Sequence, residues 1–373
     1  MQKIKVVHIV EALGGGVYTY FTDLSHVFGN DERVDTTIIY SDKREEIDRN
    51  KVVADFGKKI SLVKVSMEKE ISPLKDLRAT LELRKLLKKI DPDIIHLHSS
   101  KISVIGRLAH FLTFSKAKLY YTPHGYAFLR EDISFRKKKV YRHIEKYGQR
   151  FMGGKTIACG DTELEHAQNM GSACLVRNGI NIDSVRKLKE NIENEKLTIG
   201  ILGRITFARN PDLFNNLALK HPKINFLWIG DGEMKDSLSA KNIQKTGWFV
   251  NKETAIKHLN KIDIYLQTSL WEGLPIALLE AMALEKPVLA TNVIGNIDAV
   301  AHGETGFLFN NEIEFEHYLS KLQNPVLRKE MGKKGYERCK KLFNVEKNLT
   351  SMIDLYIDEL QDNKLQKSKA RKR

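Results

Sequence analysis

The stretch LTIGILGRITFARNP, residues 197–211, decides the fold, because it begins a second series of strands and helices halfway along the chain. Its apolar start, LTIGILG, is short and rich in β-branched residues, which is typical of a buried strand. Similar strands are predicted at NFLWIG (225–230), IDIYLQ (262–267) and PVLAT (287–291). Between the last two, the apolar segment ALLEAMALE (277–285) predicts a helix.

The first half of the chain carries an equivalent series. Runs rich in β-branched and aromatic residues predict strands at KIKVVHIV (3–10), DTTIIY (35–40), DIIHLH (93–98), KLYYTPHG (118–125) and KTIACG (155–160). Helix-length segments separate them, such as PLKDLRATLELRKLLKKI (73–90). Strand and helix in repeated alternation predict a parallel doubly wound sheet. We therefore expect an α/β protein with two Rossmann-like domains, linked by the polar segment at 181–196.

Length and composition agree with two globular domains. The 373 residues exceed the usual limit for one hydrophobic core, and 42% of them are hydrophobic. The three cysteines, Cys159, Cys174 and Cys339, fit neither a disulfide framework nor a metal site. The N-terminus lacks a signal-peptide pattern, and no apolar run reaches the roughly 20 residues that span a bilayer. We expect a cytoplasmic protein that is not integral to the membrane.

Positive charge is concentrated in two segments. The formal net charge is +14, and the excess gathers in FRKKKVYRHIEKYGQR (135–150) and KLQKSKARKR (364–373). As a helix, the first segment has a basic face beside a few apolar residues, which favours reversible docking on an anionic membrane surface. A solvated charged face with a disordered tail is the alternative. Nucleic acid is not the expected partner, because the interleaved aromatics and known modules of nucleic-acid-binding proteins are missing.

Loops that follow strands are the candidate sites, because ligands of open α/β sheets bind beyond the carboxyl ends of the strands. The loop ALGGGVYTYF (12–21) follows the first strand and opens a helix. Gly14, Gly15 and Gly16 would let backbone N–H groups approach an anion at the helix N-terminus. We predict a phosphate or acceptor loop, with a simple tight turn as the alternative.

Two arginines follow the first strand of the second series. GRITFARNP (203–211) places Arg204 and Arg209 near the strand end and the start of the next helix. Two fixed cations there could clamp a diphosphate and stabilise the charge on a departing nucleotide. Ordinary surface arginines are the alternative.

The segment WEGLPIALLEAMALEKPVLAT (271–291) is the most specific one for chemistry. Glu272 is predicted in a loop, Pro275 in the first turn of a helix, and Glu280 inside that helix on an apolar stretch. A buried carboxylate needs a polar partner, and sugar hydroxyls are suitable ones. We assign Glu280 to a ribose and Glu272 to a sugar. The oxygens of sugar or phosphate are assigned to the backbone amides of Gly273, Leu274, Pro275 and Ile276. A structural cap with a salt-bridged glutamate is the alternative.

Two further patterns resemble metal motifs. HLHSSK (96–101) has two histidines, but alternate residues at a strand end are poor chelators without a third ligand, so His98, Ser99 and Ser100 are predicted to line the cleft. Asp91-Pro-Asp93 precedes a strand and is interpreted as a turn. No metal site is predicted.

Taken together, these motifs resemble the glycosyltransferases of family four, a group of retaining enzymes with the GT-B fold. The spacing of Glu272 and Glu280 is similar to that family's EX7E motif, and the glycine loop, TPHG, GRIxxxRNP and IGDGE (229–233) follow in the family's order. The resemblance covers nearly the whole chain. Departures are Arg209 and Asn210 where Lys and Gly are more usual, and Asp298 with a single nearby glycine, Gly295, where Glu and two glycines are common.

The resemblance implies a layout and further roles. Residues 1–182 would form an acceptor domain and 183–345 a donor domain facing it across a cleft, with a helix in 346–373 that crosses back and ends in the basic tail. Glu272 would lie at the donor sugar, Glu280 at the ribose, and Arg204 and Arg209 at the diphosphate. His124 would lie close to the anomeric centre. Further donor-binding residues would be Gly230, Trp248, Phe249 and Val250, the last three near the nucleobase.

The predicted function is therefore transfer of a hexose or N-acetylhexosamine from a UDP-sugar to a saccharide on a polyprenyl diphosphate, with retention of configuration and without metal or cofactor. This suits bacterial capsule or envelope polysaccharide synthesis by a peripheral protein at the inner membrane face. A soluble acceptor is the alternative for the substrate. A UDP-N-acetylglucosamine 2-epimerase-like enzyme on the same fold, or a nucleic-acid-binding protein, is the alternative for the function.

Overall fold

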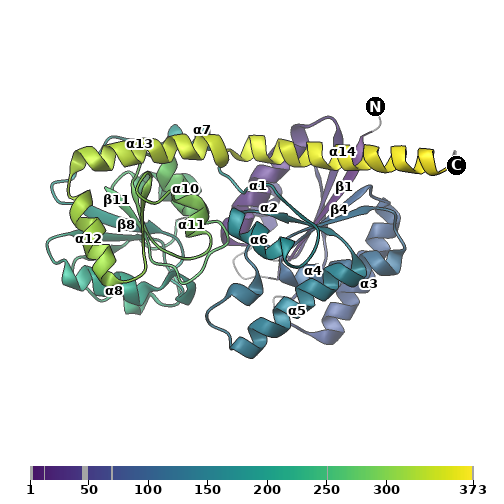
Figure 1. Ribbon diagram of the computed structural model, residues 1–373, viewed down its shortest axis with the longest axis horizontal. Coiled ribbons are helices and arrows are strands. Elements are labelled where there is room, and N and C mark those ends of the chain that lie inside the picture. The colour runs from purple at the N-terminus through teal and green to yellow at the C-terminus, as the bar shows by residue number, and fades with distance from the viewer. Residues whose placement is uncertain (1–2, 12, 44–48, 69, 250, 372–373) are drawn as a thin grey trace. The chain divides into compact units, whose positions relative to one another are not determined.

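The chain folds into two compact units in the computed structural model, which describes residues 3–11, 13–43, 49–68, 70–249 and 251–371 (Figure 1). The first unit comprises Met1–Phe128, Phe135–Arg177 and Val345–Arg373. The second comprises Leu129–Ser134 and Asn178–Asn344. Each unit has its own parallel sheet, so each is treated by itself below.

The first unit is built on a seven-stranded sheet with the order β3-β2-β1-β4-β5-β6-β7. Its strands are β1 (Ile4–Val10), β2 (Val34–Tyr40), β3 (Ser61–Lys64), β4 (Ile94–His98), β5 (Lys118–Thr122), β6 (Lys155–Ala158) and β7 (Ala173–Leu175). All neighbouring strands pair in parallel. The order reverses beside β1, which makes the carboxyl ends of β1 and β4 the switch point where ligands of such sheets bind.

Helices cover both faces of this sheet (Figure 1). They are α1 (Gly15–Asn30), α2 (Arg49–Asp55), α3 (Pro73–Ile90), α4 (Ser100–Thr113), α5 (Phe135–Met152), α6 (Asp161–Gln168) and α14 (Val345–Arg371), with a 3-10 turn, η1, at Ala127–Leu129. The last helix, α14, packs against α1, and its Met352, Ile353 and Tyr356 are fully buried in the core with residues of β1 and β2. The C-terminal segment is therefore part of the first unit's core.

Alternation along β4 assigns its side chains to the two faces. Leu97 lies next to Gly106 of α4, where an added Cβ would come within 2.5 Å of a Leu97 methyl. His96 and His98 point to the opposite face, since successive side chains of a strand alternate. There His96 bonds to Tyr356 of α14, and the ring of His98 packs at 4.8 Å from that of Phe21 of α1. Two histidines therefore lie fully buried in the core beneath α1 and α14.

The second unit repeats the architecture with a six-stranded parallel sheet in the order β10-β9-β8-β11-β12-β13. Its strands are β8 (Thr198–Leu202), β9 (Asn225–Ile229), β10 (Ile243–Lys245), β11 (Ile264–Gln267), β12 (Val288–Thr291) and β13 (Gly306–Phe309). Its helices are α7 (Ile182–Arg186), α8 (Pro211–Lys220), α9 (Lys252–Leu259), α10 (Ile276–Ala283), α11 (Asn296–Ala299), α12 (Glu312–Leu322) and α13 (Pro325–Leu342), with 3-10 turns η2 (Phe207–Arg209) and η3 (Lys235–Ser237). The order reverses beside β8, so the carboxyl ends of β8 and β11 form this unit's switch point.

The predicted fold class is confirmed, since both halves are doubly wound parallel sheets. Every strand predicted from the sequence is present, but β3, β7, β10 and β13 were not predicted. These four are three or four residues long, and all of them are edge strands; a segment this short has little periodicity to detect. Asp91 lies in a left-handed turn at φ 48° after α3, and Asp93 accepts a hydrogen bond from the Lys5 amide, so the interpretation of Asp91-Pro-Asp93 as a turn is also confirmed.

Within the described residues, no helix combines the length and apolar character needed to cross a membrane.

Candidate active site

Among the described residues, three of the six non-glycine residues with positive φ lie in loops at the carboxyl ends of strands. Ser99 directly follows β4 and has φ 81°, while His124 lies two residues after β5 and has φ 54°. Asn210 follows the β8 end and has φ 53°. Positive φ in residues other than glycine is uncommon and clusters at functional sites. The conformation of Asn210 explains why asparagine can replace the glycine usual in the family, since asparagine tolerates positive φ better than most residues. Its side chain also caps α8, accepting a hydrogen bond from the Leu213 amide.

In the second unit, Arg209 and Glu272 converge at the switch point. Nε of Arg209 lies 3.4 Å from Oε1 of Glu272. Gln267, the last residue of β11, bridges them: its Oε1 lies 3.2 Å from Nη1 of Arg209, and its Nε2 donates to Glu272 Oε1 at 2.7 Å. Ser269 also donates to the same carboxylate oxygen at 2.7 Å. The sequence placed the arginine and the glutamate here, but Gln267 and Ser269 were missed.

Electrostatics keeps Arg209 charged. Burial opposes the charge of Arg209, but the neighbouring Glu272 carboxylate outweighs it, and the pKa of Arg209 is raised. Beneath it, Tyr265 donates to Gln267 Oε1 at 3.0 Å, and burial raises the pKa of this phenol, so it remains a neutral donor. A fixed cation, an oriented carboxylate and neutral donors therefore lie together at the carboxyl ends of β8 and β11, the wall of the candidate site. This arrangement suits a sugar attached to a diphosphate.

Glycines let the loops of this wall approach one another. Gly203 lies under the Arg209 guanidinium, and an added Cβ would stand 3.1 Å from Cζ. A Cβ on Gly230 would lie 2.3 Å from the carbonyl oxygen of Gly203. Gly295 has φ 84°, and its Cβ would lie 2.2 Å from the carbonyl oxygen of Gly273 and 2.7 Å from Cβ of Glu272. The predicted residues Gly230 and Gly273 are thus in the same packed loop cluster as Arg209 and Glu272.

Helix α10 begins four residues after Glu272. Leu274 is buried, Pro275 is at the N-cap position, and Ile276 is the first residue of the helix. The amides that follow the Gly-Leu-Pro turn therefore lie at a helix N-terminus beside Glu272, where oxygen ligands are favoured. Proline has no backbone N–H, so Pro275 cannot donate to a sugar or phosphate oxygen as its assignment with the neighbouring amides implied.

Glu280 lies on α10 and is buried, with 3% of its surface exposed. Its Oε1 lies 2.6 Å from Nζ of Lys252, the first residue of α9. The polar partner of the carboxylate in this structure is thus a lysine, which agrees with the alternative of a salt-bridged glutamate. A carboxylate has about four acceptor sites, so one ion pair leaves capacity for hydroxyl groups. Lys252 was not predicted, because its partner lies 28 positions away on another helix.

The predicted nucleobase segment leads into that lysine. Trp248 is exposed over 63% of its surface, and Phe249 packs its ring against His258 at 4.7 Å. Val250 lies outside the described residues. An exposed tryptophan that precedes the partner of Glu280 by four positions is available for stacking. Arg204 is exposed beside Gly203.

In the first unit, the glycine loop and His124 are connected through α1. The helix begins at Gly15, after Gly14 in extended conformation, and Gly16 lies in its first turn. Tyr20, one turn further, packs its ring edge-on against His124 at 4.8 Å. Ala12 of the same loop lies outside the described residues. The structure thus brings α1, which the glycine loop opens, into contact with the loop after β5.

The residues predicted to line the cleft, His98, Ser99 and Ser100, each contact a different partner. His98 stacks on His124 with their planes 18° apart, and the Nδ1 of His98 lies 3.0 Å from Nε2 of His124. Ser99 donates to Glu11 at 2.7 Å. Ser100 opens α4 and lies 3.5 Å from the hydroxyl of Tyr121. His98 itself is fully buried, so it supports His124 from beneath.

A third histidine joins this cluster from β1. His8 pairs with His96 in the strand register, and its Nδ1 lies 3.0 Å from Nε2 of His98. One ligand atom from each of His8, His96 and His98 falls within 4.8 Å of the others, close enough to consider a metal ion. The sequence did not indicate His8 as a third histidine, because only the parallel register of β1 and β4 brings it near the other two.

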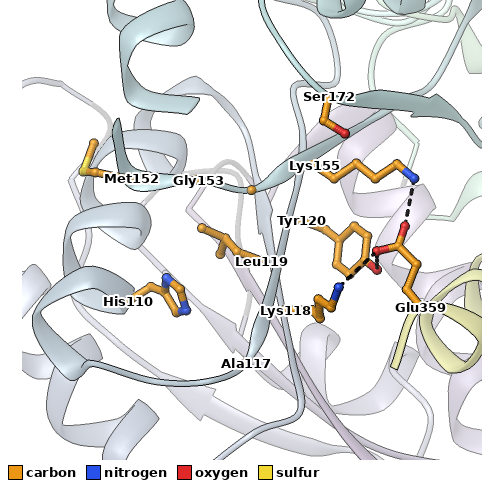
Figure 2. Close-up of a pocket in the computed structure, with 11 residues that line it drawn as sticks. His110, Ala117, Lys118, Leu119, Tyr120, Met152, Gly153, Lys155, Ser172 and Glu359 are labelled. Atoms are coloured by element: carbon orange, nitrogen blue, oxygen red, sulfur yellow. Dashed lines mark hydrogen bonds and ion pairs between the residues drawn. The ribbon is translucent and has the colours of Figure 1, made fainter. Parts of the chain in front are cut away.

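A separate pocket of about 400 Å³ lies at the opposite end of the strands in the first sheet (Figure 2). Lys118 and Lys155, the first residues of β5 and β6, line it with Glu359 of α14. Glu359 lies 2.8 Å from Lys155 and accepts a hydrogen bond from Tyr120 at 2.8 Å (Figure 2). The pocket is at the amino ends of the strands, and its charges are paired, so its contacts attach α14 to the unit.

Comparison with known proteins assigns both halves. The family described as "Glycosyltransferase Family 4" matches residues 14–184, and that described as "Glycosyl transferases group 1" matches residues 185–338. An Escherichia coli relative, UDP-Gal:alpha-D-GlcNAc-diphosphoundecaprenol alpha-1,3-galactosyltransferase, is 29% identical over 78% of this chain and 81% of its own. Staphylococcus aureus CapM, a capsular polysaccharide biosynthesis glycosyltransferase, is 25% identical over 88% of this chain and 92% of its own. The Anabaena protein HepE, solved with UDP and glucose, superposes with a TM-score of 0.74 at 15% identity, covering 94% of this chain and 99% of its own.

Proposed function

This chain belongs to glycosyltransferase family four and has that family's GT-B architecture of two Rossmann-like domains, and from this we propose that it transfers a hexose or N-acetylhexosamine from a UDP-sugar to a saccharide on a polyprenyl diphosphate. The observation that carries the proposal is the contact between Arg209 and Glu272 beside the start of α10. It combines a cation for a diphosphate with a carboxylate for sugar hydroxyls at the second unit's switch point.

The donor is proposed to bind to the second unit. Arg209 neutralises the diphosphate as it departs, and backbone N–H groups at the start of α10 donate hydrogen bonds to its oxygens, so that no metal ion is needed. Glu272 orients the sugar through its hydroxyls, because Gln267 and Ser269 fix the position of one carboxylate oxygen. Arg204, exposed on the same loop, supplies the second positive charge when the diphosphate is bound.

The nucleoside is proposed to lie along the Trp248–Lys252 segment and α10. Glu280 receives the ribose hydroxyls on the acceptor sites that Lys252 leaves available. The exposed Trp248 supplies a stacking surface for the base. The preference for UDP is supported by the relatives, since the E. coli enzyme is named for UDP-Gal and the Anabaena protein was solved with UDP.

The acceptor is proposed to bind to the first unit, near the glycine loop and His124. The name of the E. coli relative describes a saccharide on diphosphoundecaprenol, and CapM is named for capsule synthesis, which supports a lipid-linked acceptor in envelope polysaccharide synthesis. Retention of configuration is part of the proposal through the family resemblance.

A peripheral contact with the inner membrane face is proposed through α5. Its basic residues accompany an exposed apolar row, namely Val140, Ile144, Tyr147 and Phe151, of which the sequence indicated only Val140 and Tyr147. Buried Glu145 fixes the helix on its other side, accepting hydrogen bonds from Ser103 and Tyr121. An apolar row flanked by Lys and Arg suits the interface of an anionic bilayer. The tail at 364–373 adds positive charge.

The test is a transfer assay with the full chain. UDP-galactose, UDP-glucose and UDP-N-acetylglucosamine are each incubated with undecaprenyl-diphosphate-linked N-acetylglucosamine, and a lipid-linked disaccharide is the expected product with one of them. Nuclear magnetic resonance of the new linkage reports whether configuration is retained, and EDTA tests the proposed independence from metal. Conversion of a UDP-sugar without any acceptor would instead indicate the epimerase alternative. Duplex binding without affinity for any UDP-sugar would indicate a nucleic-acid-binding protein.

A further inference from the structure

Buried histidines form a hydrogen-bonded chain that leads from the core to His124. Nε2 of His124 lies 3.0 Å from Nδ1 of His98, and Nε2 of His98 lies 3.0 Å from Nδ1 of His8. His8 and His98 are fully buried, whereas His124 is partly exposed. The chain therefore has one end under α1 and the other at the loop after β5.

The three rings are neutral at physiological pH. Burial lowers the pKa of His8 and His124 to about 3, and it lowers the pKa of His98 well below the ordinary value, with further lowering by the neighbouring histidines. A neutral imidazole carries one N–H and one lone pair. Three rings thus have three protons, and the two contacts between rings use two of them. One N–H remains, either at Nε2 of His8 or at Nδ1 of His124.

Burial decides between these two ends. Nε2 of His8 is buried and has no hydrogen-bond partner among the described residues. An N–H placed there would be an unpaired donor in the core, which is rare and costly in proteins. At the partly exposed end, the N–H can donate to water or to a ligand. The favoured arrangement therefore has the proton on Nδ1 of every ring, each donating toward His124.

We propose that His8 and His98 are positioning residues that hold His124 as its Nδ1–H tautomer, making it a fixed hydrogen-bond donor to an oxygen of the bound sugar nucleotide or acceptor. The inference rests on the proposed function for the identity of that ligand. In this arrangement the Nε2 lone pair of His124 is occupied by His98, and its Nδ1 already carries a proton. His124 thus does not serve as a general base, and the ligand group facing it presents a lone pair.

The chain of histidines also makes His124 selective as a hydrogen-bond donor. A ligand N–H or O–H could donate a hydrogen bond to Nδ1 of His124 only if all three rings changed tautomer, which would place an unpaired N–H on His8 in the core. A metal ion on His8, His96 and His98 would be incompatible with the chain. It would take one nitrogen from each ring and so break at least two hydrogen bonds, because both nitrogens of His98 are bonded to the other histidines and those of His96 to Tyr356 at 2.6 Å and to Thr122 at 2.9 Å.

Nitrogen-15 spectra of the histidine rings in the full chain test the tautomers directly. Signals of His98 and His124, assigned by loss in single variants, are expected to show neutral rings protonated at Nδ1 between pH 7.5 and about 5.5. A proton on Nε2 of His124, a charged ring in that range, or zinc bound in equal proportion to the purified protein would overturn the inference. This measurement needs no substrate, so it stands whether or not the proposed transfer is observed.

Kinetics of matched variants tests the consequence. His98→Phe removes both bonds of the chain and is expected to lower kcat about tenfold with a smaller change in KM, whereas His98→Asn, which retains a donor near the Nδ1 position, keeps most of the activity. His96→Phe is the control, equally buried but outside the chain. Equal losses in His98→Phe and His96→Phe, or no difference between the two His98 variants, would contradict the role of His98. Circular dichroism and melting temperature confirm that each variant is folded. Absence of transfer by the wild-type chain would instead contradict the proposed function.

Discussion

Nε of Arg209 lies 3.4 Å from Oε1 of Glu272, and the same oxygen accepts hydrogen bonds from Gln267 and Ser269. Three groups therefore converge on one carboxylate oxygen. Glu272 contacts Arg209, whereas Glu280, eight residues later in the chain, contacts Lys252, so the two tasks proposed for these carboxylates can be tested separately.

Glu272→Gln tests the first task. The amide keeps the size of the side chain but removes its charge, so sugar orientation is lost while the diphosphate contacts remain. We expect kcat for transfer to fall about 100-fold. Calorimetry should show UDP affinity changed by less than about threefold. A large loss of UDP affinity would mean that Glu272 acts on the nucleotide.

Glu280→Gln tests the second task and serves as a matched comparison. Removing this carboxylate weakens the hydrogen bonds to the ribose and leaves Lys252 without its partner. UDP affinity is expected to fall about tenfold, as for loss of a charge-assisted hydrogen bond. Lys252→Met separates the effects, since it removes the ion pair and keeps the Glu280 carboxylate. UDP binding unchanged in Glu280→Gln would exclude a ribose role for Glu280.

Gly295→Ala tests whether the loop after β12 positions Glu272. An alanine Cβ would collide with the carbonyl oxygen of Gly273 at 2.2 Å, in addition to occupying φ 84°. The Glu272 loop must shift, so transfer is expected to fall at least about tenfold. Gly303→Ala is the control: it has φ 80° but no atom within 4 Å of the added Cβ, so it shares only the backbone strain, about 1 kcal/mol of folding free energy. Equal activity of both variants would argue against the loop's role.

Membrane docking through α5 is tested by sedimentation with vesicles of phosphatidylglycerol and phosphatidylcholine. Replacing Lys137, Lys138 and Lys139 by Gln removes three charges at about 1 kcal/mol each, so binding should weaken about 100-fold. Lys333, Lys334 and Lys340 on α13 form a control set with the same change in net charge. Vesicles of phosphatidylcholine alone should bind both forms weakly. Equal loss in both sets would indicate a general charge effect and contradict docking by α5.

Acid sensitivity should follow from the buried histidines. Burial keeps His8, His96, His98 and His124 neutral in the folded state, with pKa values lowered below 6.5. The unfolded chain takes up these protons first as pH falls below about 6.5, so the free energy of unfolding decreases by about 1.4 kcal/mol per pH unit for each histidine. The decrease continues until the folded pKa near 3 is reached for His8 and His124. Urea unfolding between pH 7.5 and 5 measures the slope.

His96→Phe is the control for that slope. It removes one titrating group from the same core, and the decrease in the free energy of unfolding should become smaller by about 1.4 kcal/mol per pH unit. An unchanged slope in this variant would mean that His96 is already protonated in the folded protein.

The sequence by itself determined the architecture and the places of several candidate site residues. Alternation of apolar strands with helical segments requires parallel sheets, since a right-handed crossover helix is the short way to return to the same sheet edge. It also placed Arg209, Glu272 and Glu280 in loops and on a helix at strand carboxyl ends, where such sheets bind ligands. Local spacing was sufficient for these assignments, because each depends on residues that are neighbours along the chain.

Only the tertiary structure decided the partners. His8 meets His98 because β1 and β4, 90 positions apart, pair in one parallel register. Gln267 links Arg209 to Glu272 because β11 ends between two loops, and Lys252 reaches Glu280 from a separate helix. Such contacts depend on strand order and on how helices pack over the sheet. A sequence pattern with a period of two or 3.6 residues contains no information about either.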